Sequence, residues 1–190
     1  MSSFALTVND MRDHYKSNMK AGRQSRYHPK QEQISFFQSQ AKASLSANGQ
    51  DVVKGLELYS QTLGQEESTS IEAYITASTQ TLKNNNVSTA AKNIFKEALE
   101  QKRAQAMEQA AKNVNRIFDE ALRIGEAYPE AHGVIIGVLE SVMTFFQALF
   151  DKVATFISVV LNSIVEWVVD AWNSIKNTFT SITSWISGWF

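Results

Sequence analysis

The last 56 residues of the chain carry apolar side chains in a single helical phase. From Ile135 to Trp189 these side chains recur at spacings of three or four residues, with a mean of 3.6. This is the period of a straight α-helix and not the 3.5 of a coiled-coil seam. We call this set, with the tryptophans beside it, the apolar stripe. Its members are Ile135, Val138, Val142, Phe145, Leu149, Val153, Phe156, Val160, Ile164, Trp167, Trp172, Ile175, Phe179, Ile182, Trp185, Ile186 and Trp189.

The apolar stripe takes up about half of the helical circumference, which is wider than the sector that an ordinary helix turns toward a soluble core. The opposite half is polar and includes Glu140, Ser141, Thr144, Gln147 and Asp151. A half-cylinder of bulky apolar side chains has to be covered. The candidates are a lipid surface, other copies of the same chain, and the protein's own remaining helices.

The phase of the stripe also predicts how far the helix extends. No Gly or Pro occurs between residues 138 and 187, and the phase is kept across Asp151-Lys152 and across Asn173–Asn177. Turns between separate helices have no physical reason to preserve a phase. We therefore expect residues 135–190 to form one continuous helix, about 80 Å long at 1.5 Å per residue.

The rest of the chain also favours helices. It contains few turn-forming residues, with 8 Gly and 2 Pro in 190 residues, and no segment alternates with a period of two. The predicted fold class is all-α: a helical body of short helices plus one long Ala-rich helix, followed by a long amphipathic C-terminal arm. Stops at Asn48-Gly49 and Gly64, and caps at Asp51, Thr69 and Ser88, give predicted helices over residues 7–20, 31–47, 51–63, 69–82 and 88–128. The inner face of the last is predicted to include Ala91, Ile94, Ala98, Ala110, Val114, Ile117, Ala121 and Ile124.

Charge divides the chain into three predicted parts. Residues 1–30 form a basic N-terminal arm with six basic and two acidic side chains, residues 31–128 a polar helical body, and residues 129–190 the membrane-active or assembly arm. A basic arm attracts phosphate, whether in lipid headgroups or in nucleic acid. We expect anionic-lipid contacts from Arg12, Lys16, Lys20, Arg23, Arg26 and Lys30. Nucleic acid is disfavoured as a partner because the body is acidic and carries no recognition-helix pattern.

The sequence offers no constellation for catalysis. There is no cysteine, the three histidines are scattered, and no phosphate-cradling glycine loop or nucleophile elbow occurs. Acidic and basic residues interleave along residues 96–120 as on a solvated helix face. We therefore expect no enzyme activity, no metal and no cofactor.

The favoured function is that of a non-enzymatic protein that inserts its C-terminal helix into lipid. The hydroxyl-rich polar half resembles the lipid-packing-sensor class of amphipathic helices, which bind by apolar insertion more than by charge. Gly133–Phe150 and Val153–Val169 each fall slightly short of the roughly 20 residues of a membrane span. Permeabilisation or remodelling, as by a toxin or effector, is the stronger form of this hypothesis. The alternative is a self-assembling filament, coat or scaffold subunit that buries the stripe between copies, and a homo-oligomer is expected in either case.

The start of the chain bears on localisation. Met1–Asp10 lacks the charged and apolar regions of a secretory signal. We expect a peripheral or inserted membrane protein, or one exported by a route without a classical signal peptide, with a soluble form also open.

Overall fold

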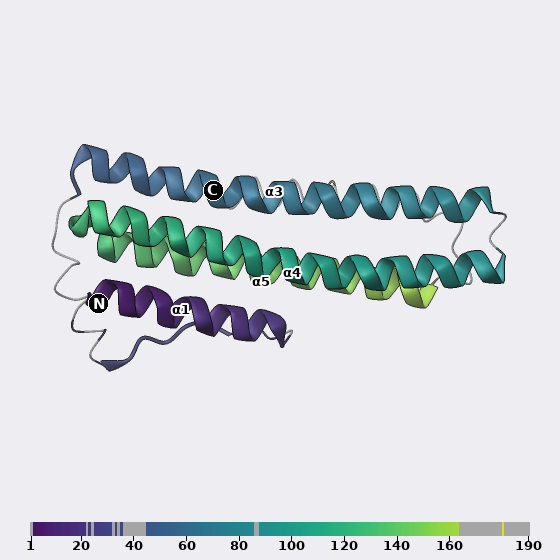
Figure 1. Ribbon diagram of the computed structural model, residues 1–190, viewed down its shortest axis with the longest axis horizontal. Helices are drawn as coiled ribbons and strands as arrows, with labels where there is room; N and C mark the ends of the chain where they lie inside the picture. Colours follow the sequence, from purple (N-terminus) through teal and green to yellow (C-terminus); the bar gives the residue numbers. More distant parts are fainter. Residues whose placement is uncertain are drawn as a thin grey trace. The chain divides into compact units, whose positions relative to one another are not determined.

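The computed structural model describes residues 2–21, 23, 25–31, 33, 35, 45–85, 88–163 and 180, without the side chains of residues 156 and 160–163. Within these residues the elements are helices and no strand occurs: α1 (Ser3–Lys20), α3 (Ala47–Asn84), α4 (Thr89–Ala127), the short 3₁₀ helix η1 (Pro129–Ala131) and α5 (His132–Ser163) (Figure 1). The predicted all-α class is confirmed. Most of the predicted helix over residues 31–47 lies outside the described residues.

Helix α1 begins four residues before the predicted start at Thr7. Ser2 is its N-cap, and the Ser2 hydroxyl accepts a hydrogen bond from the Ala5 amide at 3.2 Å. A side-chain oxygen at this position satisfies one of the amides that a helix start leaves unpaired. The buried residues of α1 recur at helical spacing and form one face: Phe4, Thr7, Val8, Met11 and Tyr15.

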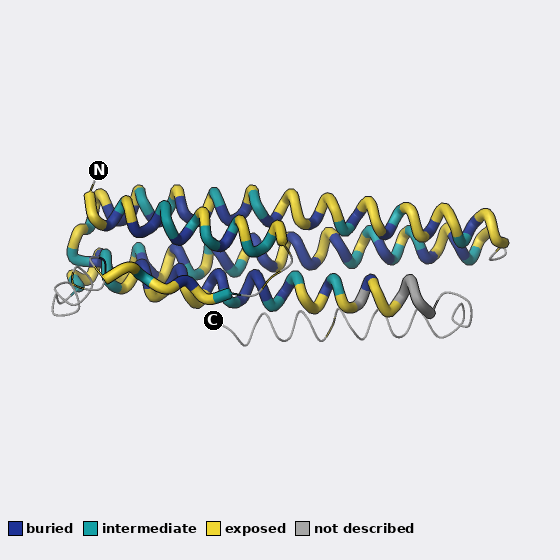
Figure 2. Tube along the Cα trace, turned by 90° about the horizontal axis from the view of Figure 1, so that it is seen from below, coloured by how far each residue is buried: buried dark blue, intermediate teal, exposed yellow. Residues whose placement is uncertain are grey.

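Helix α3 joins two predicted short helices into one of 38 residues, so the predicted breaks at Asn48-Gly49 and Gly64 are wrong. The cap is Ser46 and not Asp51, because the Ser46 hydroxyl accepts from the Gly49 amide at 3.1 Å. One buried face runs along α3 past Gly64, and this face includes polar residues. Its members are Val53, Leu56, Ser60, Leu63, Gly64, Glu67, Ser68, Ile71, Ile75, Thr79 and Leu82 (Figure 2). Because these polar residues interrupt the apolar periodicity, the buried face of α3 is not apparent from the sequence.

Helix α4 has the predicted ends. The Ser88 hydroxyl accepts from the Ala91 amide at 3.2 Å, and the helix stops at Ala127, two residues before Pro129. The predicted inner face is right at Ala91, which is buried, but wrong at Ile94, which is 63% exposed, whereas Phe95 and Leu99 are buried. Phe95 and Leu99 together carry more apolar area than Ile94 and Ala98, so turning them inward buries more surface.

The chain divides into two compact units, and each is described by itself. Unit 1 comprises Met1–Thr62 and Ala111–Ala148, and unit 2 comprises Leu63–Ala110 and Leu149–Phe190. These boundaries fall inside α3, α4 and α5, whereas the sequence-based division at residues 30 and 128 stays a prediction. In unit 2, α3 and α4 pair along a seam where the Lys102 ammonium donates to the Ser70 hydroxyl at 2.9 Å. The core of unit 1 contains the buried face of α1 and the first half of α5.

Candidate membrane-associating helix

Within the described residues, one stretch is long and apolar enough to cross a membrane. It covers the 31 residues Pro129–Val159, that is η1 and most of α5. Length and composition are the only grounds for this statement, since the core helix of a soluble protein passes the same test. What distinguishes α5 from α3 and α4 is that it carries few charges, with Glu140, Asp151 and Lys152 in its 32 residues.

The described part of the apolar stripe is buried inside the monomer. Each of its six members with a described side chain is at most 7% exposed: Ile135, Val138, Val142, Phe145, Leu149 and Val153. Of the three candidates for covering the stripe, the protein's own helices therefore cover this part. The side chains of Phe156 and Val160 lie outside the described residues, as do Ile164, Trp167, Trp172, Ile175, Phe179, Ile182, Trp185, Ile186 and Trp189. The predicted continuation of the helix beyond Ser163 also lies outside the described residues.

The buried sector of α5 is wider than the stripe. It also contains Ile136, Leu139, Met143, Phe146 and Ile157. These residues follow or precede stripe positions by one, so a count of apolar residues on both sides of the stripe would have found them. Burial on this scale means that α5 is a central core element in the described structure, not a helix lying on its surface.

Gln147 departs from the prediction that it lies on the exposed polar half. It is 8% exposed, and its amide nitrogen lies 3.5 Å from the backbone oxygen of Ser25. This hydrogen bond satisfies a polar group that would otherwise be costly to bury. The polar half is otherwise exposed at Glu140, Ser141 and Asp151.

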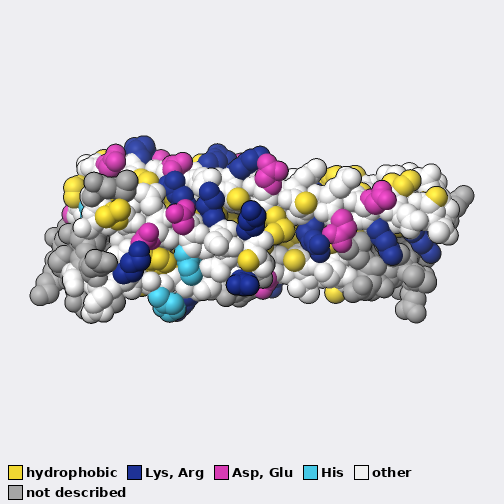
Figure 3. Space-filling view, turned by 60° about the horizontal axis from the view of Figure 1, so that its bottom comes forward, with side chains coloured by type: hydrophobic (Ala, Val, Ile, Leu, Met, Phe, Trp, Pro, Cys, Tyr) yellow, Lys and Arg dark blue, Asp and Glu magenta, His cyan; other side chains and the backbone are white. Residues whose placement is uncertain are grey.

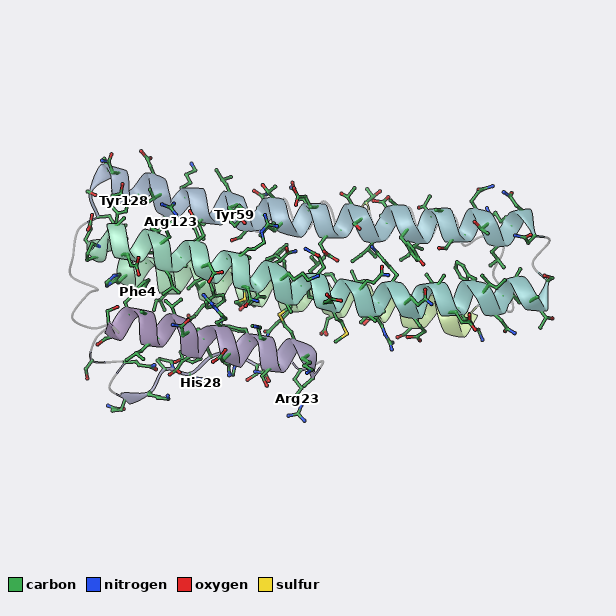
Figure 4. The ribbon with its side chains drawn as sticks, in the orientation of Figure 1. Phe4, Arg23, His28, Tyr59, Arg123 and Tyr128 are labelled. Carbon is green, nitrogen blue, oxygen red and sulfur yellow. The ribbon has the colours of Figure 1, made fainter. Side chains whose placement is uncertain are left out.

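Helix α1 covers the beginning of α5. The Phe4 ring stacks on the His132 ring, with centroids 3.9 Å apart and planes inclined by 7°. The His132 Nε2–H donates to the Gly125 backbone oxygen at 2.8 Å. Phe4 points from α1 toward α4 (Figure 4) and fills the space that a side chain at Gly125 would take. The first turn of α1 is thus held where α4 ends and α5 begins.

Further along α1, polar contacts secure the same interface. Arg12 donates to the Asp119 carboxylate at 2.7 Å, and its guanidinium lies 5.8 Å from the centre of the Phe118 ring. Tyr15 is fully buried, and its hydroxyl accepts from the Tyr27 amide at 3.4 Å. Burial raises the pKa of Tyr15 above its usual value. These contacts make α1 part of the folded unit 1.

The six basic residues expected to contact anionic lipid fall into two groups. Arg12 pairs with Asp119, and the Lys30 ammonium pairs with the Asp10 carboxylate at 2.8 Å. The hydrogen bond from Lys30 lowers the pKa of Asp10. The other group consists of the exposed Lys20, Arg23 and Arg26, and the half-buried Lys16. On the face shown in Figure 3, Lys and Arg are interspersed with Asp and Glu.

Unit 2 holds a small polar cluster in the seam between α3 and α4. Glu67 and Lys102 are 6% and 9% exposed, and the Lys102 ammonium lies 5.4 Å from the centre of the Tyr74 ring. Burial raises the pKa of Glu67, and the charge of Lys102 acts in the opposite direction. The Ser68 hydroxyl is buried without a hydrogen-bond partner. A seam of this kind packs less favourably than an apolar one.

A hollow of about 270 Å³ lies at the end of the same seam. Its lining carries no charged side chain and consists of Ser78, Thr81, Leu82, Asn85, Ser88, Ala90, Ala91, Ile94, Phe95 and Ala98. In the described part of the chain, no group of three or more His, Asp or Glu residues is placed to hold a metal ion. No family model, curated protein or solved structure matches the chain.

Proposed function

We propose that this chain is a non-enzymatic protein that associates with membranes through α5 and the C-terminal residues that follow it. The observation that carries the proposal is the 31-residue apolar stretch Pro129–Val159, continued in sequence by the remainder of the stripe. The described part of the apolar stripe is buried in the monomer. It can therefore contact lipid only after it has left the protein core, so lipid competes with the core for this face.

The packing of the bundle makes such a competition physically reasonable. The inner face of α4 includes Ala106, Ala110 and Ala121, which bury little apolar area. The buried face of α3 includes the polar residues Ser60, Glu67 and Thr79. The body thus offers α5 weaker packing than an apolar bundle of the same length, whereas lipid offers the whole stripe an apolar surrounding.

The placement of tryptophan permits a direct test. All four tryptophans lie between residues 167 and 189, so the intrinsic emission of the full chain reports the C-terminal segment without a label. Mixed with phosphatidylcholine–phosphatidylglycerol vesicles, the protein is expected to float with the lipid. Its emission is expected to shift to shorter wavelength and to be quenched by brominated acyl chains.

Two substitutions that introduce the same charge separate insertion from adsorption. Trp167→Asp, on the stripe, is expected to abolish flotation while the body stays helical. Asn173→Asp, on the polar half of the predicted helix, is expected to leave flotation intact. Equal flotation of both variants would count against insertion through the stripe. If the chain instead pellets as filaments without lipid, the self-assembly alternative takes its place.

The basic residues add an electrostatic part to the proposal. Each Lys or Arg near an anionic surface contributes about 1 kcal/mol, and salt screens this contribution. Lys16, Lys20, Arg23 and Arg26 are the residues expected to supply it, because Arg12 and Lys30 are held in ion pairs. Flotation should therefore weaken at high salt, and binding indifferent to salt would remove this part alone.

A further inference from the structure

We infer that the segment directly after α1 binds the phosphate groups of anionic lipids, and that His28 makes this binding stronger in acid. The segment consists of residues 25–30, and we call it the strap. The inference rests on the proposed function, because it names a lipid class and a regulation for the same membrane contact. It goes beyond the contribution of Lys and Arg, whose charge does not change near neutral pH.

The strap runs back along α1 and is fastened to it near both ends. At its start, the Ser25 backbone oxygen accepts from the His14 Nε2–H at 3.0 Å. At its end, the Lys30 ammonium donates to the Asp10 carboxylate at 2.8 Å, and the Gln33 amide nitrogen donates to the same carboxylate at 3.1 Å. The partners on α1 move from residue 14 to residue 10 as the strap advances, so the two segments are antiparallel (Figure 1).

Tyr27 fixes the orientation of the strap. This residue is 9% exposed, and its hydroxyl donates to the Gln33 side-chain oxygen at 2.8 Å. Its amide donates to the buried Tyr15 hydroxyl at 3.4 Å. Its ring lies edge-on to the His14 ring, with centroids 5.7 Å apart. A buried aromatic ring with a bonded hydroxyl holds a segment in one orientation more firmly than a surface ion pair does.

The side chains of the strap alternate between the inside and the outside. The odd-numbered residues are buried or half-buried: Ser25, Tyr27 and Pro29. The even-numbered residues are exposed, and all three are basic: Arg26, His28 and Lys30. In an extended segment, side chains two residues apart lie on the same side at a spacing of about 6–7 Å. These three residues therefore form one outward edge, the basic edge, and Figure 4 shows its His28 alongside α1.

The basic edge has one permanent uncompensated cation and one that depends on pH. The charge of Lys30 is compensated by Asp10, its ion-pair partner. Among the described residues, no ion pair involves Arg26 or His28. Arginine binds a phosphate through two parallel hydrogen bonds, and a protonated histidine donates from both ring nitrogens. The basic edge thus offers one cation for phosphate when His28 is neutral and two when it is protonated.

The helices beside the strap carry other titratable groups. Besides Asp10, they are Asp13, His14 and Tyr15 on α1 and Glu140 on α5. His14 is half-buried, and its Nε2–H donates to the strap whether or not the ring is charged. Burial raises the pKa of Tyr15, so this side chain stays neutral. Histidine is the side chain whose charge ordinarily changes between about pH 5 and pH 8. On the outward edge, acid therefore acts through His28.

Vesicle partitioning of the full chain at two pH values tests the inference. The protein is mixed with phosphatidylcholine–phosphatidylglycerol vesicles, whose phosphodiesters stay anionic in acid, at about pH 5 and about pH 8. His28 should make partitioning about fivefold stronger at the lower pH, which is the effect of one cation near an anionic surface. His28→Gln should lose this increment, whereas His28→Arg should keep the stronger partitioning at both pH values.

The matched control moves the histidine without changing the charge of the protein. His28→Gln together with Gln105→His places it at an exposed position of α4. This double variant should partition like His28→Gln. If either of them keeps the pH dependence of the wild type, the strap is not the site of acid-dependent binding. Vesicle binding that does not depend on His28 would still leave the proposed function standing.

If the protein binds vesicles at neither pH, the proposed function fails, and a soluble lipid decides the question of the strap. Dihexanoyl phosphatidylglycerol below its micelle concentration presents the same phosphate without a membrane. At about pH 5, where histidine is ordinarily protonated, its addition should shift the ring proton resonances of His28. Those of the half-buried His14 and His132 should not move. An unshifted His28, or equal shifts of all three histidines, would overturn the inference.

Discussion

The ring of Phe4 lies flat on the imidazole of His132, with centroids 3.9 Å apart and planes 7° from parallel. This stack joins the first turn of the first helix to the first turn of the most apolar helix. The Phe4 ring also lies so close to Gly125 that a Cβ added there would clash with Phe4 Cε1, Cζ and Cδ1. The start of α1, the end of α4 and the start of α5 therefore meet at a single side chain.

Phe4→Ala is expected to lower the free energy of unfolding by about 3–5 kcal/mol, the range for removing a buried aromatic ring. Phe4 is 2% exposed, and its removal leaves a cavity between α1, Gly125 and His132. Urea denaturation followed by circular dichroism measures the change. Leu6→Ala is the matched control, because Leu6 lies on the same helix but is 51% exposed; it should change the free energy by no more than about 0.5 kcal/mol. Equal effects of the two substitutions would contradict the burial of Phe4.

Gly125→Ala is expected to destabilise the protein although alanine favours helices. In an open helix interior the substitution stabilises by up to about 1 kcal/mol. At Gly125 the new methyl group displaces the Phe4 ring, so we expect a net loss of about 1–3 kcal/mol from overpacking. Gly55→Ala in α3 provides the contrast, because nothing lies within 4 Å of its added Cβ, and it should stabilise.

A double-mutant cycle identifies the cause of that loss. In the Phe4→Ala background the ring is gone, and Gly125→Ala should then approach the behaviour of Gly55→Ala. If the loss persists in this background, the close approach of Phe4 is not its source.

Apolar periodicity predicts the helices whose buried faces consist of apolar residues. It does not predict the full length of a helix whose buried face includes polar residues. The class, the Ser88 cap and the break at Tyr128-Pro129 were predictable because caps and prolines act locally. The continuity of α3 was not, since Ser60, Glu67 and Ser68 interrupt the apolar pattern that a prediction follows. Gly64 does not end α3, because the helical segments before and after this buried glycine both have buried residues.

For the candidate membrane-associating helix α5, too, the sequence predicts some features and not others. The sequence gives the face of α5 that is buried through residue 153, because a period of 3.6 specifies a face. It cannot give which helices pack against that face, since contacts between segments distant in the sequence, such as that of Phe4 with His132, depend on tertiary packing. The sequence predicts a helix over residues 7–20, but only the spacing of Phe4, Met11 and Tyr15 indicates that this helix packs against the rest of the protein.

Two acidic residues are expected to give opposite pH dependences. The Lys30 hydrogen bond lowers the pKa of Asp10 below 3.8 in the folded state. Its contribution is therefore present above that value and lost as the pH falls through the folded pKa. Asp10 is partly exposed, so the contribution is small, and Asp10→Asn should remove it. Denaturation of wild type and variant should converge at the lowest pH that keeps the protein folded; a constant difference would contradict the pairing.

Glu67 should act in the other direction. Burial raises its pKa above 4.5, so the folded state holds the proton more tightly than the unfolded state. The free energy of unfolding should then decrease as the pH rises from about 4.5 through the folded pKa. Glu67→Gln should become more stable relative to wild type as the pH rises above 4.5. Glu66→Gln, at the exposed neighbouring position, should show no such trend, and a trend in both variants would assign the effect elsewhere.

Truncation after Ala131 is expected to abolish cooperative unfolding. It removes α5, which supplies about a third of the buried hydrophobic residues in the described part of the chain. The faces of α1 and α4 that pack around Phe4 and Phe118 would then be open to water. We expect a chain that keeps helical circular dichroism, loses its cooperative urea transition and binds a hydrophobic dye. Truncation after Ser163 keeps α5 and is the control expected to unfold cooperatively. A cooperative transition in the shorter chain would mean that the rest of the protein folds without α5. The apolar face of α5 would then not have to leave a protein core before it contacts lipid.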